Sequence, residues 1–242
     1  MDDDLELKAE DFHIFPTVVT RGNIPKSLYD KDVIMDMIVE NLDDNGQTMD
    51  FIGNGAFIHH DERLNKIYNI IVEYLKYHFS LFALNPNDYQ IYIVKSWFNV
   101  NTKDHRNAMH THNEADYSVT FYPHVPAGSK KWLRLIRPAH YNTNEIFPGQ
   151  WFNWSETKNY LNANEWIVMP EEGDVMIFPA SLEHDTINED FSDSNQGNQT
   201  VASREDLQDM RICIGVDVKL TAKTKTLNYK ILQPVSTWRT FD

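Results

Sequence analysis

Residues 211–219 read Arg-Ile-Cys-Ile-Gly-Val-Asp-Val-Lys. Side chains alternate between the two faces of a β-strand. One face of this strand is therefore apolar and holds Ile212, Ile214, Val216 and Val218. The other face places small and polar groups beside a cation, and holds Arg211, Cys213, Gly215 and Asp217. We expect other elements to cover the apolar face while the Arg211 face lines a barrel or cleft; the ordinary alternative is that this second face meets solvent.

Two segments with helical periodicity could cover the apolar face. Apolar residues recur at helical spacing from about Lys31 to Leu42, and a second such stripe follows Asp61 and ends before Asn85. A short entry strand is expected at 15–19. The later chain is typical of short aromatic and β-branched strands at 90–99, 117–122, 131–137, 166–169, 174–178 and 211–219. Helices first and strands later predict an α+β chain.

Composition and charge exclude several classes of protein. The 242-residue chain has a net charge of −14 and one cysteine, Cys213. It can form no internal disulfide and no cysteine-based zinc site, and a reducing cytoplasm fits best. The negative charge would repel a phosphate backbone and disfavours nucleic acid as a partner. With no signal-peptide pattern and no apolar run long enough to span a bilayer, we expect no membrane partner; the oligomeric state does not follow from the sequence.

Two long segments between the expected strands have a different character. Residues 188–209 are rich in Asp, Ser, Asn and Gln, a composition that cannot bury a core, so we expect an excursion between two strands. Residues 143–164 contain Trp151, Phe152 and Trp154. Both segments could form a lid and substrate wall, although ordinary loop packing would explain the aromatic residues nearly as well.

Residues 108–114 read Ala-Met-His-Thr-His-Asn-Glu and suggest a metal site. On an extended segment, His110 and His112 project to the same side, about 6–7 Å apart at the backbone. A third ligand is available at His184, just past the strand at 174–178. Nitrogen and oxygen ligands without cysteine are typical of a non-haem metal with open positions. A His-x-His pair alone also fits surface or core imidazoles, and we expect a structural role for His59, His60, His105, His124 and His140.

The order of these motifs resembles a family of 2-oxoglutarate/Fe(II) oxygenases found in bacteria and their phages. The resemblance covers roughly residues 12–220. Its motifs are Phe15-Pro16-Thr17, Trp97-Phe98-Asn99-Val100-Asn101, His110-Thr111-His112, Ser118-Val119-Thr120-Phe121-Tyr122, the segment from Gly173 to His184, and Arg211-Ile212-Cys213. Three positions depart from the family pattern, with Asn113 in place of Pro, Val119 in place of Gly, and Cys213 in place of Ser.

The resemblance implies a double-stranded β-helix, the jelly-roll or cupin-like barrel, with the N-terminal helices on its outer face. It implies one domain at 1–220, with a helical support region at 1–88 and a jelly-roll core at 89–220, followed by a C-terminal extension at 221–242.

The resemblance also implies the cofactors and their ligands. Fe(II) would be held by His110, His112 and His184, and 2-oxoglutarate would be the cosubstrate. An alternative ligand is Glu114, because related oxygenases use His-x-Glu, which His112 and Glu114 also satisfy.

Three further residues are implied at the cosubstrate. Arg211 would pair with the distal carboxylate of 2-oxoglutarate, because its planar fork carries a permanent charge. Tyr122 would donate its hydroxyl to the same carboxylate. Asn99 would line the pocket.

The activity implied is hydroxylation of an unidentified small-molecule or peptide substrate, with release of succinate and CO₂, in the cytoplasm, or in the host cytoplasm if the chain comes from a phage. Two alternatives remain open. One is a non-catalytic jelly-roll module with a structural or binding role. The other is a cupin-like metalloprotein that has three histidine ligands and does not use 2-oxoglutarate.

Overall fold

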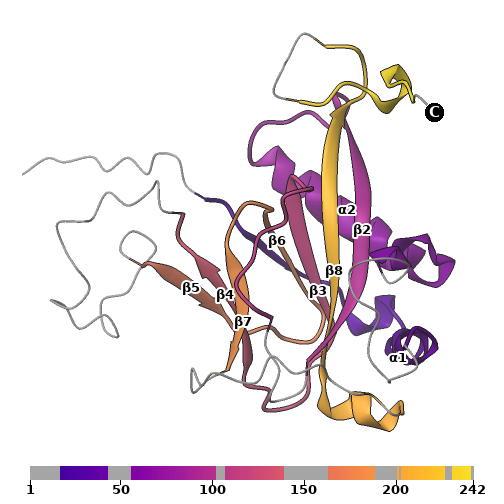
Figure 1. Ribbon diagram of the computed structural model, residues 1–242, viewed down its shortest axis with the longest axis vertical. Coiled ribbons are helices and arrows are strands. Elements are labelled where there is room, and N and C mark those ends of the chain that lie inside the picture. Colours follow the sequence, from indigo (N-terminus) through magenta and orange to yellow (C-terminus); the bar gives the residue numbers. More distant parts are fainter. Residues whose placement is uncertain are drawn as a thin grey trace, which may run out of the picture.

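The computed structural model describes residues 17–42, 56–101, 107–138, 163–188, 201, 203–226 and 231–240. These residues form two α-helices and two antiparallel sheets, which confirms the α+β class. Figure 1 shows the helices beside the larger sheet and the smaller sheet on its other side. Within this part of the chain, no helix is long and apolar enough to cross a membrane.

The larger sheet has five strands in the order β1-β6-β3-β8-β2. Their bounds are β1 (Thr20–Asn23), β2 (Tyr89–Asn101), β3 (Tyr117–His124), β6 (Asp174–Pro179) and β8 (Arg211–Ala222). The smaller sheet has the order β5-β4-β7. Its strands are β4 (Lys131–Ile136), β5 (Glu165–Val168) and β7 (His184–Asn188).

The helices are α1 (Lys31–Glu40) and α2 (Asn65–Ser80). The side chain of Asp30 accepts hydrogen bonds from the backbone of Asp32 and Val33, which satisfies free N–H groups at the start of α1. Short 3₁₀ helices lie at Lys26–Leu28, Ile58–His60, Glu62–Leu64, Glu205–Asp209 and Val235–Thr237.

Strand β8 separates two packed regions, as the alternation of its sequence predicts. The apolar residues of β8 belong to a core cluster that also contains Ile34 and Ile38 of α1 and Ile71 and Leu75 of α2. Burying each such aliphatic side chain contributes roughly 1.5–3 kcal/mol. On the opposite face, Cys213 joins a second cluster that includes residues of the smaller sheet. The expectation that both helices cover the apolar face of β8 is therefore confirmed.

Two strands differ from the sequence expectation. The first strand begins at Thr20 and not at 15, and residues 15 and 16 lie outside the described residues. Strand β7 was not expected, because His-Asp-Thr-Ile-Asn has no apolar alternation. It is nevertheless buried, since its polar side chains have partners: Asp185 pairs with Arg134, and Thr186 accepts from Arg211.

The expectation for residues 188–209 is wrong at the C-terminal end of that segment. Two apolar residues of this polar stretch, Val201 and Leu207, are buried in the core cluster that also contains residues of the helices. Arg204 also pairs with Asp32 and Asp36. Two ranges lie outside the described residues: 189–200 of this segment, and 143–162 of the other segment expected to form a lid or substrate wall.

The C-terminal extension is joined to the sheet. Strand β8 continues through Thr221 and Ala222, two residues beyond the expected end of the domain. The backbone N–H of Ala222 then donates to the carbonyl of Leu232 at 2.8 Å.

A buried histidine makes the stability of this core depend on pH. His78 of α2 is fully buried, and its Nδ1 lies 2.7 Å from the hydroxyl oxygen of Thr20. Burial lowers the pKa of His78 below its ordinary value of 6.5. The unfolded chain therefore binds a proton more readily than the folded protein.

We expect the contribution of His78 to be fully present above about pH 6.5 and to decrease as the pH falls below that value. His78→Phe should reduce the loss of unfolding free energy between pH 7 and pH 5. Urea denaturation at several pH values would measure this slope. An unchanged slope in the variant would contradict the assignment.

Candidate metal centre and pocket

A backbone bridge brings the sequence-distant histidines together. His110 and His184 form an antiparallel β-bridge, in which each backbone N–H donates to the other residue's carbonyl, at 3.0 and 3.1 Å. The N–H of His112 donates to the carbonyl of Ala180 at 2.9 Å. The segment around His110 and His112 is therefore attached to both ends of the turn that connects β6 and β7.

Each of the three imidazoles has its Nδ1 atom facing an oxygen acceptor. For His110 this is the carbonyl of Ala108 at 2.7 Å, and for His184 the carbonyl of Leu182 at 2.8 Å. For His112 it is a carboxylate oxygen, Oδ1 of Asp217, at 2.9 Å. Because these oxygens accept hydrogen bonds, each Nδ1 is placed to donate, and in a neutral ring of this tautomer the lone pair lies on Nε2.

The free ligand atoms converge. His110, His112 and His184 each offer one nitrogen within 4.8 Å of the others. Nε2 of His112 lies 3.3 Å from Nε2 of His184. At that distance the two nitrogens can share a proton or can both bind a cation placed between them. The donor set therefore fits a divalent transition ion, for which neutral imidazole is a common ligand.

Burial keeps His184 neutral. The residue is 5% exposed, and burial lowers its pKa to about 4, so near neutral pH its Nε2 is available as a ligand. The Phe178 ring packs edge-on against His184 at a centroid distance of 4.8 Å. His110 in contrast is exposed and marks the open side of the site.

A glycine makes room for the aromatic ring that packs on His112. The Trp97 ring stacks on His112 with centroids 5.6 Å apart and an angle of 25°. A Cβ atom at Gly215 would lie 2.6 Å from that indole ring, closer than real Cβ contacts. The absence of a side chain at Gly215 therefore allows Trp97 to reach its place beside the site.

Glu114, the alternative ligand, is not part of this group. The chain turns after His112, where the N–H of Ala115 donates to the His112 carbonyl at 3.2 Å. The Glu114 side chain is exposed and pairs with Lys95. Among the described residues, the only group of three or more potential metal ligands is the histidine trio.

Arg211 lies in the same pocket as the histidines. It is 3% exposed. Its guanidinium donates to Oδ1 of Asn101 at 2.5 Å, and to Thr186 and the Lys131 carbonyl at longer distances. These three partners are neutral oxygens, and Nε of Arg211 is buried without a hydrogen-bond partner among the described residues. A buried permanent charge in such surroundings favours an anionic ligand.

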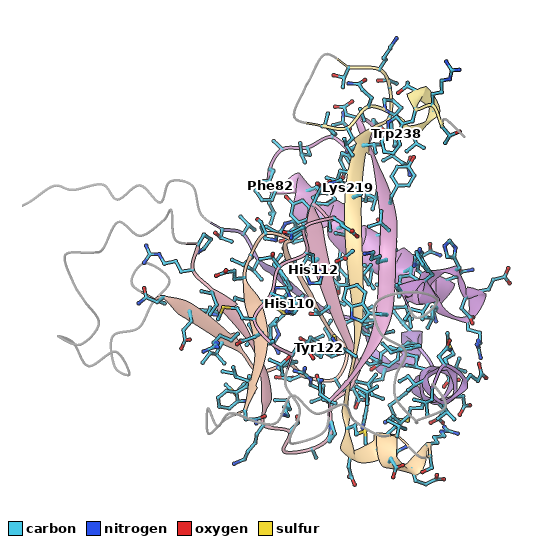
Figure 2. All side chains as sticks on the ribbon, in the orientation of Figure 1. Phe82, His110, His112, Tyr122, Lys219 and Trp238 are labelled. Atoms are coloured by element: carbon cyan, nitrogen blue, oxygen red, sulfur yellow. The ribbon has the colours of Figure 1, made fainter. Side chains whose placement is uncertain are left out.

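The other expected pocket residues line this space as well. Asn99, Tyr122 and Cys213 border the pocket together with Arg211 and the three histidines. Figure 2 shows His110 and His112 side by side between the sheets, with Tyr122 further along the same space. The Tyr122 ring lies 5.4 Å below the Arg211 guanidinium, and burial raises the pKa of Tyr122, so its hydroxyl keeps its proton.

Several residues have roles in this geometry that the sequence did not predict. They are Asp217 at His112, Asn101 and Thr186 at Arg211, and Trp97 against His112. The alternation of β8 already placed Asp217 on the pocket face. The partners of Arg211 become visible only with the strand register, which pairs Asn101 with Arg211.

Among the described residues, the other histidines lie outside the metal-ligand group. His124 contacts Glu172 and the carbonyl of Gln208, and the rings of His59 and His60 pack against each other at 4.3 Å. His105 and His140 lie outside the described residues.

Part of this chain matches a known protein family. Residues 95–196 match the family described as "Putative 2OG-Fe(II) oxygenase". The match covers a little under half of the chain and includes the three histidines, whereas Arg211 lies beyond it. The cofactors of this family are Fe(II) and 2-oxoglutarate, and the histidine trio could bind the metal.

Solved structures show weak overall similarity to this chain. A prolyl-4-hydroxylase from Pseudomonas putida has a TM-score of 0.45 and 11% identity, and the alignment covers 83% of this chain and 84% of that chain. AviO1 from Streptomyces viridochromogenes Tue57 has a TM-score of 0.45 and 10% identity, with coverages of 84% and 90%. An oxidoreductase of the 2OG-Fe(II) oxygenase family from Burkholderia pseudomallei has a TM-score of 0.32 and 11% identity; the alignment covers 53% of this chain and 45% of that one. No curated protein gives a significant match.

Metal binding provides the direct test of the histidine trio. We expect one divalent transition ion per chain. His184→Ala and His110→Ala should each weaken binding by more than the roughly 10–100-fold that loss of an outer-shell partner costs, because each removes a ligand. Oxygen-free titration with Fe(II), checked by elemental analysis, would measure the affinity.

Glu114→Gln is the control for this titration. Because Glu114 pairs with Lys95 outside the group, the variant should bind the metal like the wild type. If Glu114→Gln lost the metal while His110→Ala kept it, the ligand set would be His112, Glu114 and His184 instead.

Proposed function

We propose that this protein is a 2-oxoglutarate- and Fe(II)-dependent dioxygenase that hydroxylates a small-molecule or peptide substrate and releases succinate and CO₂. The observation that carries the proposal is the combination of two groups in one pocket: a convergent histidine trio and a buried arginine without an anionic partner among the described residues. A metal-chelating dicarboxylate would join them, with one end at the metal and its distal carboxylate at Arg211.

The chain's own residues would bind and orient the cosubstrate. Arg211 presents a planar fork that matches a carboxylate. Asn101 and Thr186 hold the fork through its Nη2 atom, and Nε has no partner in the part of the chain that the structure describes. Tyr122 keeps a hydroxyl proton to donate, and Asn99 borders the same space.

The contacts around the three histidines would orient their ligand atoms in the metal-free protein. Their Nδ1 atoms are held by two carbonyls and one carboxylate, so the three Nε2 atoms need little reorganisation to bind an ion. When bound, the metal and 2-oxoglutarate supply the oxidative chemistry. Trp97 packs on His112 and Phe178 on His184, and these rings would limit the access of water to the two imidazoles.

We also propose that the two sheets form a double-stranded β-helix with the helices on its outer face. Support comes from the pocket, which is lined by residues of both sheets, including Tyr122 of β3 and Leu133 of β4. The helices pack on the opposite face of the larger sheet. One domain would then extend through β8, and the remaining C-terminal residues would form an extension.

The three histidine ligands support a second candidate function. Iron oxygenases of the facial-triad type use two histidines and one carboxylate, whereas the group here contains three histidines. A cupin-like three-histidine metalloprotein would have the same ligands without needing 2-oxoglutarate. It would not require an anion at Arg211, so binding of 2-oxoglutarate distinguishes the two functions.

Turnover would test the proposed activity. Purified protein with Fe(II) and 2-oxoglutarate in air should form succinate, faster when a panel of peptides and small metabolites includes the substrate. His184→Ala is the matched inactive control. Succinate formation that is absent with every panel member, or equal in His184→Ala, would contradict the proposal.

The role of Arg211 can be tested without turnover. Removing one partner of a buried ion pair costs about 3–5 kcal/mol, so Arg211→Ala should weaken 2-oxoglutarate binding by roughly two to four orders of magnitude. Arg211→Lys should recover only part of the loss, because an ammonium cannot form the fork. Calorimetric titration of 2-oxoglutarate into oxygen-free, metal-loaded protein would measure both.

Two comparisons complete this experiment. Metal affinity should remain in Arg211→Ala, because Arg211 is not one of the ligands. Arg204→Ala, which changes a partly exposed arginine paired with α1, should bind 2-oxoglutarate like the wild type. Equal binding in the wild type and Arg211→Ala would remove the cosubstrate role, and no binding to the wild type would favour the second candidate.

A further inference from the structure

We propose that Asp217 is a positioning residue that fixes His112 as a metal ligand. The inference rests on the proposed metal centre but concerns a residue outside the ligand set. Asp217 lies on the pocket face of β8, two residues after Gly215. Its Oδ1 atom is 2.9 Å from Nδ1 of His112, on the side of the imidazole opposite the ligand atom.

Asp217 is itself held in place and shielded from water. The residue is 4% exposed, and its Oδ1 accepts a hydrogen bond from the Ser118 hydroxyl at 3.3 Å. Ser118 lies directly opposite Asp217 in the pairing of β3 with β8. Lys95 lies opposite Asp217 in the pairing of β2 with β8, but its ammonium pairs with Glu114 instead. Within the described residues, His112 is thus the only basic side chain that pairs with this buried carboxylate.

His112 differs from the other two histidines in the kind of acceptor that holds it. His110 and His184 donate to carbonyls two residues earlier in the chain, so local backbone geometry orients these rings. His112 is oriented by a side chain from another strand. Its ring is also stacked on Trp97, which restricts tilting but does not determine which nitrogen is protonated. Only at His112 can the acceptor be removed by a substitution.

A carboxylate acceptor does more than a carbonyl in this position. It fixes the tautomer with Nδ1 protonated, and its negative charge makes the imidazole a stronger donor to a cation at Nε2. In a trio of neutral ligands, Asp217 would place a negative charge against one ligand, His112. Removal of such an outer-shell partner typically costs 10–100-fold in metal affinity.

Asp185 provides a matched control. It is also 4% exposed, lines the same pocket and follows His184 directly in the chain. Its carboxylate is engaged by Arg134, with Nε at 2.9 Å and Nη2 at 2.5 Å. Asp185→Asn therefore removes a buried negative charge beside the trio but leaves the three Nδ1 hydrogen bonds intact. Comparison of the two sites separates positioning of His112 from a general charge effect.

The experiment uses Co(II) as the probe, titrated into the full-length apo-protein without 2-oxoglutarate. Asp217→Ala should weaken Co(II) binding by about 10–100-fold. Asp217→Asn should lose less affinity for Co(II), because the amide oxygen can still accept a hydrogen bond from Nδ1 of His112. Asp185→Asn should stay within about threefold of the wild type. Thermal unfolding of each apo-variant would show which of them are folded. If Asp217→Ala does not fold, Asp217→Asn still tests the role of Asp217.

A second measurement reports the hydrogen bond directly. In the Co(II)-loaded protein, each protected imidazole N–H should give a paramagnetically shifted proton signal that disappears in D₂O. One of these signals should exchange faster or vanish in Asp217→Ala, and it should remain in Asp217→Asn and Asp185→Asn. A role of Asp217 that is only structural would not remove one imidazole signal.

The outcomes distinguish this inference from the proposed function. Absence of Co(II) binding to the wild type would overturn the metal centre itself. If the wild type binds Co(II) and the folded Asp217 variants bind it equally well, only the role of Asp217 is wrong. Equal losses in Asp217→Asn and Asp185→Asn would indicate a general charge effect and would also overturn the positioning role.

Discussion

The burial of β8 on both faces is the constraint on which the rest of this structure depends. Its apolar face needs the two helices to exclude water, and its other face is buried between the two sheets, where small and polar side chains leave room for a pocket. Because side chains alternate strictly along a strand, a register shift of one residue would exchange the two faces. The same pairing therefore maintains both the core and the pocket.

The pocket is organised by backbone contacts before any ligand is considered. The bridge between His110 and His184 brings together two segments that are 74 positions apart in the chain, and it places three imidazoles from two segments at one point. Two of these rings are then oriented by nearby carbonyls. Most of the geometry of the trio thus comes from backbone contacts.

Charge is distributed along the pocket face of β8 in a way that matches an anionic ligand bound at a metal. Arg211 at the start of the strand carries a positive charge among neutral partners, and Asp217 six positions later carries a negative charge beside His112. Between them, Cys213 and Gly215 line the pocket, and the missing side chain at Gly215 accommodates Trp97. A dicarboxylate near Arg211 and a cation near His112 would each meet the opposite charge.

The sequence by itself determined the α+β class, both helices, most strands and the two faces of β8, because hydrophobic periodicity is a local property. The histidine segments were also visible in the sequence, because their motifs are short. Tertiary structure decided the rest. It showed that Glu114 lies on a turn and pairs with Lys95, that the polar strand β7 is buried, and that Asp217 meets His112. Each of these depends on which strands pair and in what register, and long-range pairing leaves no periodic signal in the residues that take part in it.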